Sequence, residues 1–297
     1  MAGNNKIDFK LYRYTPSRVA AVIFVILFSL TTAYHVYQLT RRRAWYFLAF
    51  VIGGTFQIIG YICRVLAHDH KDSVPIYSVQ TILILLAPPL YAASIYMVLG
   101  RLIIYLRAER LSIVPVRWMT KVFVTGDVVA FVMQAAGGGI MASGTVSSYN
   151  LGEHITVGGL CVQLAFFTFF MGTCALFHRR IRQSPTTEAV VVTARLHGRS
   201  TRSWEGILVG LYIASILILA RSIFRLIEYA QGNDGFLISH EVFMYVFDST
   251  LMVLTMVVIN VFYPSIVLGR SQRERGEELD TPAVSETGLQ ERTGTGQ

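Results

Sequence analysis

Charged side chains occur inside apolar segments of this chain. The first examples are Arg221, Arg225 and Glu228, in the stretch RSIFRLIEYAQ that directly continues the apolar run GILVGLYIASILILA. Residues three, four or seven apart lie on one face of a helix, so these three side chains form a single stripe. Ionisable residues within membrane helices are costly, and they typically face the bundle interior, where they pair with one another or line a substrate path.

The next apolar segment carries a second stripe, formed by Glu241, Tyr245, Asp248 and Thr255. With a rise of about 1.5 Å per residue, Arg221 and Asp248 each lie about 12 Å from the outer end of their helix. The loop between the two segments is short, so the helices are expected to be antiparallel neighbours. The sequence therefore predicts an ion pair between Arg221 and Asp248.

Polar residues in earlier segments extend the candidate site. Arg64 lies at the outer end of the second segment, and Asp127 and Gln134 share a face of the fourth. Two interpretations remain open: a nearly balanced set of charges that pins helices together, or an outward-open polar pocket that receives a charged headgroup. The candidate substrate-pathway residues are Arg64, Asp127, Gln134, Arg221, Arg225, Glu228, Glu241, Tyr245 and Asp248.

These residues must be positioned by membrane helices. The 297 residues are 53% hydrophobic and 15% charged, whereas a soluble domain has about 25% charged residues. A membrane helix needs about 20 mostly apolar residues. The sequence predicts an all-α, polytopic membrane protein, a bundle of seven transmembrane helices spanning 18–38, 44–66, 77–106, 119–142, 154–178, 205–229 and 240–268.

Basic residues in the loops predict the orientation. Arginines gather in the odd-numbered loops, at 41–43, 107–117 and 179–202. By the positive-inside rule, the amino terminus lies outside and the carboxyl terminus in the cytoplasm. We expect an extracellular segment at 1–17, a transmembrane domain at 18–268 and a disordered cytoplasmic tail at 269–297. The basic loops either contact anionic headgroups or form solvated linkers, and nucleic-acid binding is not indicated because no basic face is clustered.

Glycines in two spans have expected packing roles. Gly53 and Gly60 are seven residues apart, on one side of the second span, where they permit close helix approach. The run MQAAGGGI is expected to loosen the outer end of the fourth span.

Enzyme signatures are mostly missing from the sequence. It contains no H-E-x-x-H, G-x-S-x-G or P-loop motif, so we expect neither catalysis nor a cofactor or bound metal. One alternative is an intramembrane metal-dependent lipid hydrolase, in which His240 and Glu241 would meet Asp127 and Asp248 in space.

Several segments together resemble the fungal RTA-like family, also called lipid-translocating exporters. They are YTPSRVAAVIFVILFSLTTAYHVYQ, GYICR, LLAPPLYAASIYMVLGRLI, FVTGDVVAFVMQAAGGG and RSIFRLIEYAQGNDGFLISHEVFMYVFDSTLM, and the similarity covers about residues 12–268. The resemblance implies a seven-span protein of fungal membranes. It also implies export or flipping of sphingoid long-chain bases, resistance to toxic amphiphiles or, in one branch, porphyrin or haem handling.

One position departs from the family pattern. The second span reads GGTFQIIGYICR, with Gln57 where the resemblance implies Glu. The resemblance implies that the family's polar positions are occupied by Asp127, Gln134, Arg221, Arg225, Glu228, Glu241 and Asp248. We expect a plasma-membrane exporter of amphipathic substrates such as sphingoid bases, with a vacuolar or other endomembrane location as the alternative. A seven-helix lipid sensor or receptor is the second functional hypothesis.

Overall fold

The computed structural model describes residues 16–70, 73–141, 146–195, 204–231 and 235–264. In these ranges the chain is helical, with no strand. Seven helical segments are long and apolar enough to cross a membrane. Most are single α-helices: α1 (Arg18–Arg42), α3 (Val74–Tyr105), α4 (Val116–Met141), α5 (Val146–Gln183) and α7 (Trp204–Ala230).

The second and seventh spans are composite. The second joins the 3₁₀ turn η1 (Trp45–Phe47) to α2 (Leu48–Leu66). The seventh joins α9 (Glu241–Met244), the π-helix η4 (Tyr245–Thr250) and α10 (Leu251–Val261). Three short helices lie outside the spans: η2 (Glu109–Leu111), α6 (Thr187–Arg195) and α8 (Phe236–Ser239).

The predicted seven spans are confirmed, and the largest boundary differences are at the start of the fifth span, predicted at 154 and found at Val146, and at the end of the seventh. We expected that span to run over 240–268, but its helix ends at Val261. Pro264 explains the early stop, because proline lacks an N–H and disfavours the helical conformation of the residue before it. The predicted disordered tail at 269–297 and residues 1–15 of the predicted extracellular segment lie outside the described residues.

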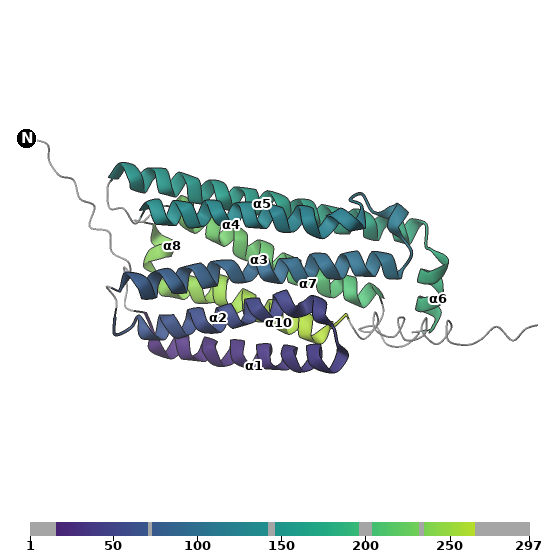
Figure 1. Ribbon diagram of the computed structural model, residues 1–297, viewed down its shortest axis with the longest axis horizontal. Coiled ribbons are helices and arrows are strands. Elements are labelled where there is room, and N and C mark those ends of the chain that lie inside the picture. The colour runs from purple at the N-terminus through teal and green to yellow at the C-terminus, as the bar shows by residue number, and fades with distance from the viewer. Residues whose placement is uncertain (1–15, 71–72, 142–145, 196–203, 232–234, 265–297) are drawn as a thin grey trace, which may run out of the picture.

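The spans pack as one bundle of roughly parallel and antiparallel helices (Figure 1). Helices α4 and α5 form one flank, and α1 and α2 form the other. Between them, α7 contacts α3, α5, η4 and α10, while α10 also contacts α1. Helices α7 and η4 therefore lie where the two flanks meet, which places their polar stripes inside the bundle.

Glycines set the closest approaches between helices. A Cβ on Gly53 of α2 would lie 2.8 Å from the Tyr91 ring of α3, so only glycine fits there. The MQAAGGGI stretch is helical up to Met141, and the loosening expected at this end of the fourth span stays a prediction. A Cβ on Gly137 would overlap Thr156 and the Gly152 carbonyl of α5. The absence of a side chain here allows tight packing of α4 against α5.

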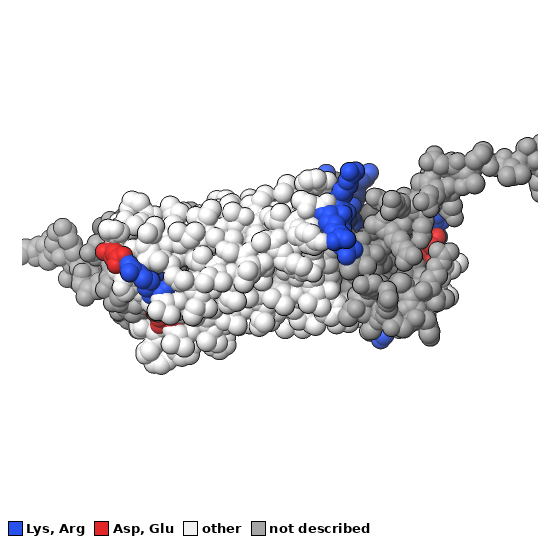
Figure 2. All heavy atoms as spheres, turned by 90° about the horizontal axis from the view of Figure 1, so that it is seen from below, with Lys and Arg blue, Asp and Glu red and all other residues white. Residues whose placement is uncertain are grey.

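The outer surface between the two ends of the bundle is apolar. Figure 2 shows Lys, Arg, Asp and Glu near the two ends of the visible face, with uncharged residues between them. On α1, Val19, Ile23, Ile26 and Leu30 are 49–71% exposed. Such a surface suits lipid rather than water, and charged groups in the middle of the bundle are confined to its interior.

Candidate functional site

The predicted ion pair between Arg221 and Asp248 is present. Arg221 Nε of α7 contacts Asp248 Oδ1 of η4, and the two side chains are 3% and 1% exposed. Arg221 Nη2 also donates to the Ile84 carbonyl oxygen of α3, at 3.4 Å. Removing one partner of such a pair leaves an uncompensated buried charge, so the two residues are expected to depend on each other strongly.

A second pair lies beside the first on α7. Arg225 Nη1 is 2.7 Å from Glu228 Oε2 and 4.0 Å from Asp248 Oδ2. The guanidinium also lies over the Tyr229 ring, 5.0 Å from its centroid. Two arginines and two carboxylates thus neutralise one another inside the bundle. We call Arg221, Arg225, Glu228 and Asp248 the central charge network.

A third pair closes the end of the bundle next to this network. Arg64 Nη2 of α2 is 2.8 Å from Glu241 Oε1 of α9, and Arg64 Nε donates to the Tyr245 hydroxyl at 3.0 Å. The Glu241 carboxylate also accepts the Ser17 backbone N–H, at 2.9 and 3.0 Å. This contact ties the start of α1 to the seventh span. We call Arg64, Glu241, Tyr245 and Ser17 the end latch.

The π-helix η4 gives the seventh span its polar face. Its six residues place Tyr245, Asp248 and Ser249 among buried groups, and Ser249 hydrogen-bonds the Tyr61 hydroxyl of α2. The Thr250 hydroxyl donates to the carbonyl oxygen five residues earlier, at 2.8 Å. Short π-helical turns occur frequently at functional sites. Sequence reasoning missed this element because it assumed a period of 3.6 residues throughout the span.

Some buried polar atoms near the middle of the bundle have no hydrogen-bond partner among the described residues. Both amide atoms of Gln57, the Thr32 hydroxyl and Asp248 Oδ2 are examples. Gln57 and Asp248 are each 1% exposed, and Thr32 is 6% exposed. Burying an unpaired polar group costs free energy, so such atoms are candidates for contact with a polar ligand. Gln57 is also the position at which the resemblance led us to expect Glu.

Asp127 and Gln134 lie apart from the other candidates. The Tyr96 hydroxyl of α3 donates to Asp127 Oδ2 at 3.1 Å, and Gln134 Nε2 donates to Gln163 Oε1 of α5 at 3.0 Å. Neither residue pairs with the central charge network in the described part of the chain. Asp127 and Gln134 therefore make contacts separate from those of the other candidates, and their place on a substrate path stays a prediction. They join α4 to its own neighbours, because their shared face is turned toward α3 and α5.

A polar junction that sequence reasoning missed links the first and last spans. His35 Nδ1 lies 2.5 Å from Asn260 Oδ1, and Gln38 Nε2 donates to the Asn260 carbonyl oxygen at 3.1 Å. His35 and Gln38 are three residues apart on one helix face, and this spacing is a signal that could have identified them.

The residues proposed for a metal site do not converge. The described residues contain no group of three or more His, Cys, Asp and Glu side chains that could hold a metal ion. His240 Nδ1 is 2.8 Å from the Phe236 carbonyl oxygen, and Asp127 lies with α3 and α4. The geometry of these residues gives the metal-dependent hydrolase no support.

Seven apolar spans around a balanced, buried charge network define a multi-pass integral membrane protein. The chain belongs to the RTA1-like protein family, whose model matches residues 50–271. This finding confirms the family resemblance seen in the sequence. No solved structure matches the chain.

Curated relatives cover most of the chain. Protein RTA1 of Saccharomyces cerevisiae is 33% identical over 96% of this chain and 97% of its own length. Protoporphyrin uptake protein 1 of the same species is 33% identical, over 85% of this chain and 91% of its own length. The sphingoid long-chain base transporter RSB1, also of S. cerevisiae, is 25% identical over 84% of this chain and 72% of its length.

Proposed function

We propose that this protein moves amphipathic lipids across a membrane, with sphingoid long-chain bases as the first substrate class to test. Two relatives support transport of a lipid or amphiphile in general, since one is named a sphingoid base transporter and another a protoporphyrin uptake protein. We further propose a plasma-membrane location, a cytoplasmic carboxyl terminus and a transporter rather than an enzyme. The basic odd-numbered loops support the orientation.

The observation that carries the proposal is the incompletely satisfied carboxylate of Asp248. This buried carboxylate lies on a π-helix inside a membrane span, and its Oδ2 has no hydrogen-bond partner among the described residues. Arg225 Nη1 is 4.0 Å from this oxygen, while Arg221 contacts the other carboxylate oxygen, Oδ1. A protonated amine headgroup fits the same position as a competing cation. The hydrocarbon tail of such a substrate would stay along the apolar surface of the bundle.

Ion-pair exchange makes this arrangement suitable for transport. An amine that binds Asp248 or Glu228 takes the place of an arginine as the partner of that carboxylate. The network then holds one more positive than negative charge, which favours release of the amine. The desolvation cost of the amine is then offset by a preformed carboxylate partner. The end latch would have to open for a headgroup to enter, because Glu241 holds both Arg64 and the start of α1. No nucleotide motif is present in the sequence, so the movement would be facilitated, gradient-driven or indirect.

Reconstitution tests the proposal directly. Purified protein in phospholipid vesicles is expected to accelerate the transbilayer movement of a fluorescent long-chain base relative to protein-free vesicles. Asp248→Asn is expected to slow it about tenfold or more, the equivalent of one charge-assisted hydrogen bond. Asp69→Asn is the matched control, because Asp69 pairs with Arg18 at an exposed end of the bundle. Equal rates with and without protein would rule out direct transport.

A lipid sensor is the second candidate function. The pairing within the central charge network favours this function, because charges that neutralise one another can hold helices together without binding a substrate. A lipid bound to the bundle could then change the arrangement of these helices. A cellular response that depends on the lipid and on this protein, together with no lipid movement in reconstituted vesicles, would favour the sensor over the transporter.

A further inference from the structure

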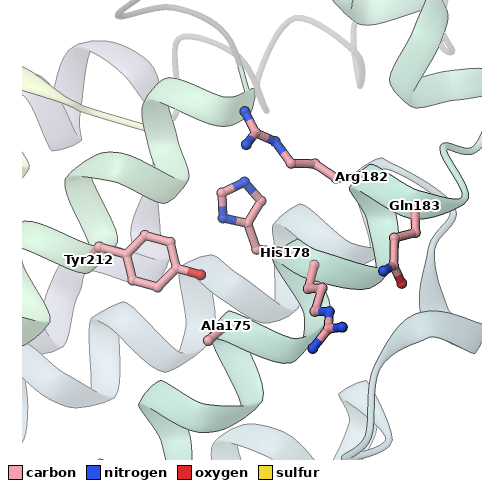
Figure 3. Close-up of a pocket in the computed structure, with 6 residues that line it drawn as sticks. Ala175, His178, Arg182, Gln183 and Tyr212 are labelled. Atoms are coloured by element: carbon pink, nitrogen blue, oxygen red, sulfur yellow. The ribbon is translucent and has the colours of Figure 1, made fainter.

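An open pocket lies at the end of the bundle opposite the central charge network. Its volume is about 470 Å³, and it lies between the carboxyl-terminal end of α5 and the first turns of α7. Figure 3 shows Tyr212 of α7 facing His178, with Arg182 on the other side of the imidazole. The residues that line it are Ala175, His178, Arg179, Arg182, Gln183 and Tyr212.

The arginines of the pocket are hydrogen-bond donors suited to an anion. Two arginines contribute planar guanidinium groups, which match the oxygens of phosphate groups in pairs. His178 Nε2 is a buried atom with no hydrogen-bond partner among the described residues. Its ring is held by Tyr212, at 5.7 Å between centroids, and by Trp204, at 6.5 Å. An imidazole fixed in this way is oriented before any ligand arrives.

The described residues neutralise the positive charge of the pocket only weakly. Arg182 is 3.4 Å from Glu205, but the two side chains are 65% and 45% exposed. Exposed pairs of this kind contribute little. Arg179 makes no ion pair among the described residues, and Arg180 donates instead to the Leu111 carbonyl oxygen, at 3.1 Å. Arg180 is therefore a neighbouring arginine that does not line the pocket.

Apolar residues beside the pocket favour a lipid over a soluble anion. Val209, Tyr212 and Ile216 are three and four residues apart on α7, so they share a helix face. Val209 and Ile216 are 45% and 54% exposed, and Leu176 on α5 is 43% exposed. The face that continues from the pocket thus suits acyl chains, while the arginines lie at the end of the span, at the level of headgroups.

We propose that this pocket binds the phosphate group of an anionic phospholipid from the leaflet at the basic end of the bundle. A cationic sphingoid base would be repelled by Arg179 and Arg182, so this site is distinct from the proposed transport path. The inference does not rest on transport, because binding is measured on the protein alone.

Lipid binding to the full-length protein in neutral detergent tests the proposal, with fluorescent phosphatidylserine as the probe and phosphatidylcholine as the neutral comparison. Arg182→Gln is expected to weaken phosphatidylserine binding about tenfold, the loss of one charge-assisted hydrogen bond. Glu205→Gln is expected to strengthen it, because it frees Arg182 from its carboxylate partner. Arg180→Gln is the matched control and is expected to leave the affinity unchanged.

Two results would overturn the proposal. If Arg180→Gln weakens binding as much as Arg182→Gln, the attraction is a general effect of surface charge and the pocket has no role. If inorganic phosphate binds as tightly as phosphatidylserine, the ligand is a soluble anion and not a lipid. A monodisperse gel-filtration profile for each variant ensures that the comparison is between folded proteins.

Discussion

At the scale of single residues, Arg221 and Asp248 form an ion pair inside the bundle, while some uncharged polar atoms there have no partner among the described residues. Both amide atoms of Gln57 are examples. The two situations have opposite energetic consequences. Removing one member of an ion pair destabilises the folded protein, because it leaves a buried charge without a partner. Replacing an unpaired buried polar group with an apolar one stabilises it, because the desolvation penalty of that group is removed.

The Arg221–Asp248 pair predicts a non-additive double mutant. Arg221→Ala and Asp248→Ala are each expected to destabilise the protein by about 3–5 kcal/mol, since each leaves a buried charge alone. The double variant is expected to cost less than the sum of the two. Thermal unfolding in detergent measures all three variants, and additive losses would show that the two groups do not interact.

Gln57→Leu is expected to stabilise the protein. Leucine is similar in volume and removes two buried atoms that lack partners, a gain of about 1–3 kcal/mol. Gln134→Leu is the matched control, because it breaks the hydrogen bond to Gln163 and is expected to lower the unfolding temperature. If Gln57→Leu is more stable but transports a long-chain base more slowly, Gln57 contacts the substrate. A lower unfolding temperature would mean that its amide is satisfied in the folded protein.

At the scale of elements, the π-helix and the glycine contacts decide which faces meet. The π-helix η4 adds one residue to a turn of the seventh span. The side chains of α9, before the extra residue, are therefore rotated about the helix axis relative to those of α10, after it. Asp248 on η4 faces Arg221, while Glu241 and Tyr245 face Arg64.

Deleting Phe247 is expected to convert η4 to a regular α-helix and to rotate Glu241 away from Arg64. Transport should be lost although the apolar span is still long enough to insert. Phe247→Ala keeps the length of the helix and alters a side chain that is 43% exposed, so it serves as the control. Vesicle transport and membrane abundance measure the outcome, and full activity of the deletion would mean that the π-helix is dispensable.

Gly137 and Gly138 offer a matched pair on α4. Gly137→Val is expected to push α4 away from α5 and to destabilise the protein by about 1–3 kcal/mol, the usual cost of overpacking. Gly138→Val places its side chain where nothing lies within 4 Å and is expected to have a much smaller effect. Thermal unfolding compares the two, and similar losses would mean that helix propensity rather than packing explains the effect.

At the scale of the whole molecule, the two ends of the bundle differ. One end holds the end latch beside the central charge network, and the other holds the basic loops and the open pocket. If the positive-inside rule applies, the latch faces outward and the pocket faces the cytoplasm. A lipid headgroup would then reach the central charge network from the outer side of the membrane, or leave the network toward that side.

The predicted orientation can be tested with tags at the two chain ends. In intact cells, a carboxyl-terminal tag is expected to resist external protease, while an amino-terminal tag is cleaved. Permeabilised cells provide the control, because both tags should then be cut. Protection of the amino-terminal tag alone would reverse the assignment and exchange the sides of the latch and the pocket.

The sequence by itself determined the seven spans, their helical class and the faces on which Arg221, Arg225, Glu228 and Asp248 lie. These properties are local, since apolar length and the spacing of three or four residues decide them. The tertiary structure decided which faces meet: Asp127 and Gln134 turn toward α3 and α5, and His35 meets Asn260. It also decided the π-helix and the arginine-lined pocket between α5 and α7, because neither follows from the spacing of residues within one helix. Side-chain pairing follows from the packing of helices, and no local pattern in a single helix specifies its neighbour.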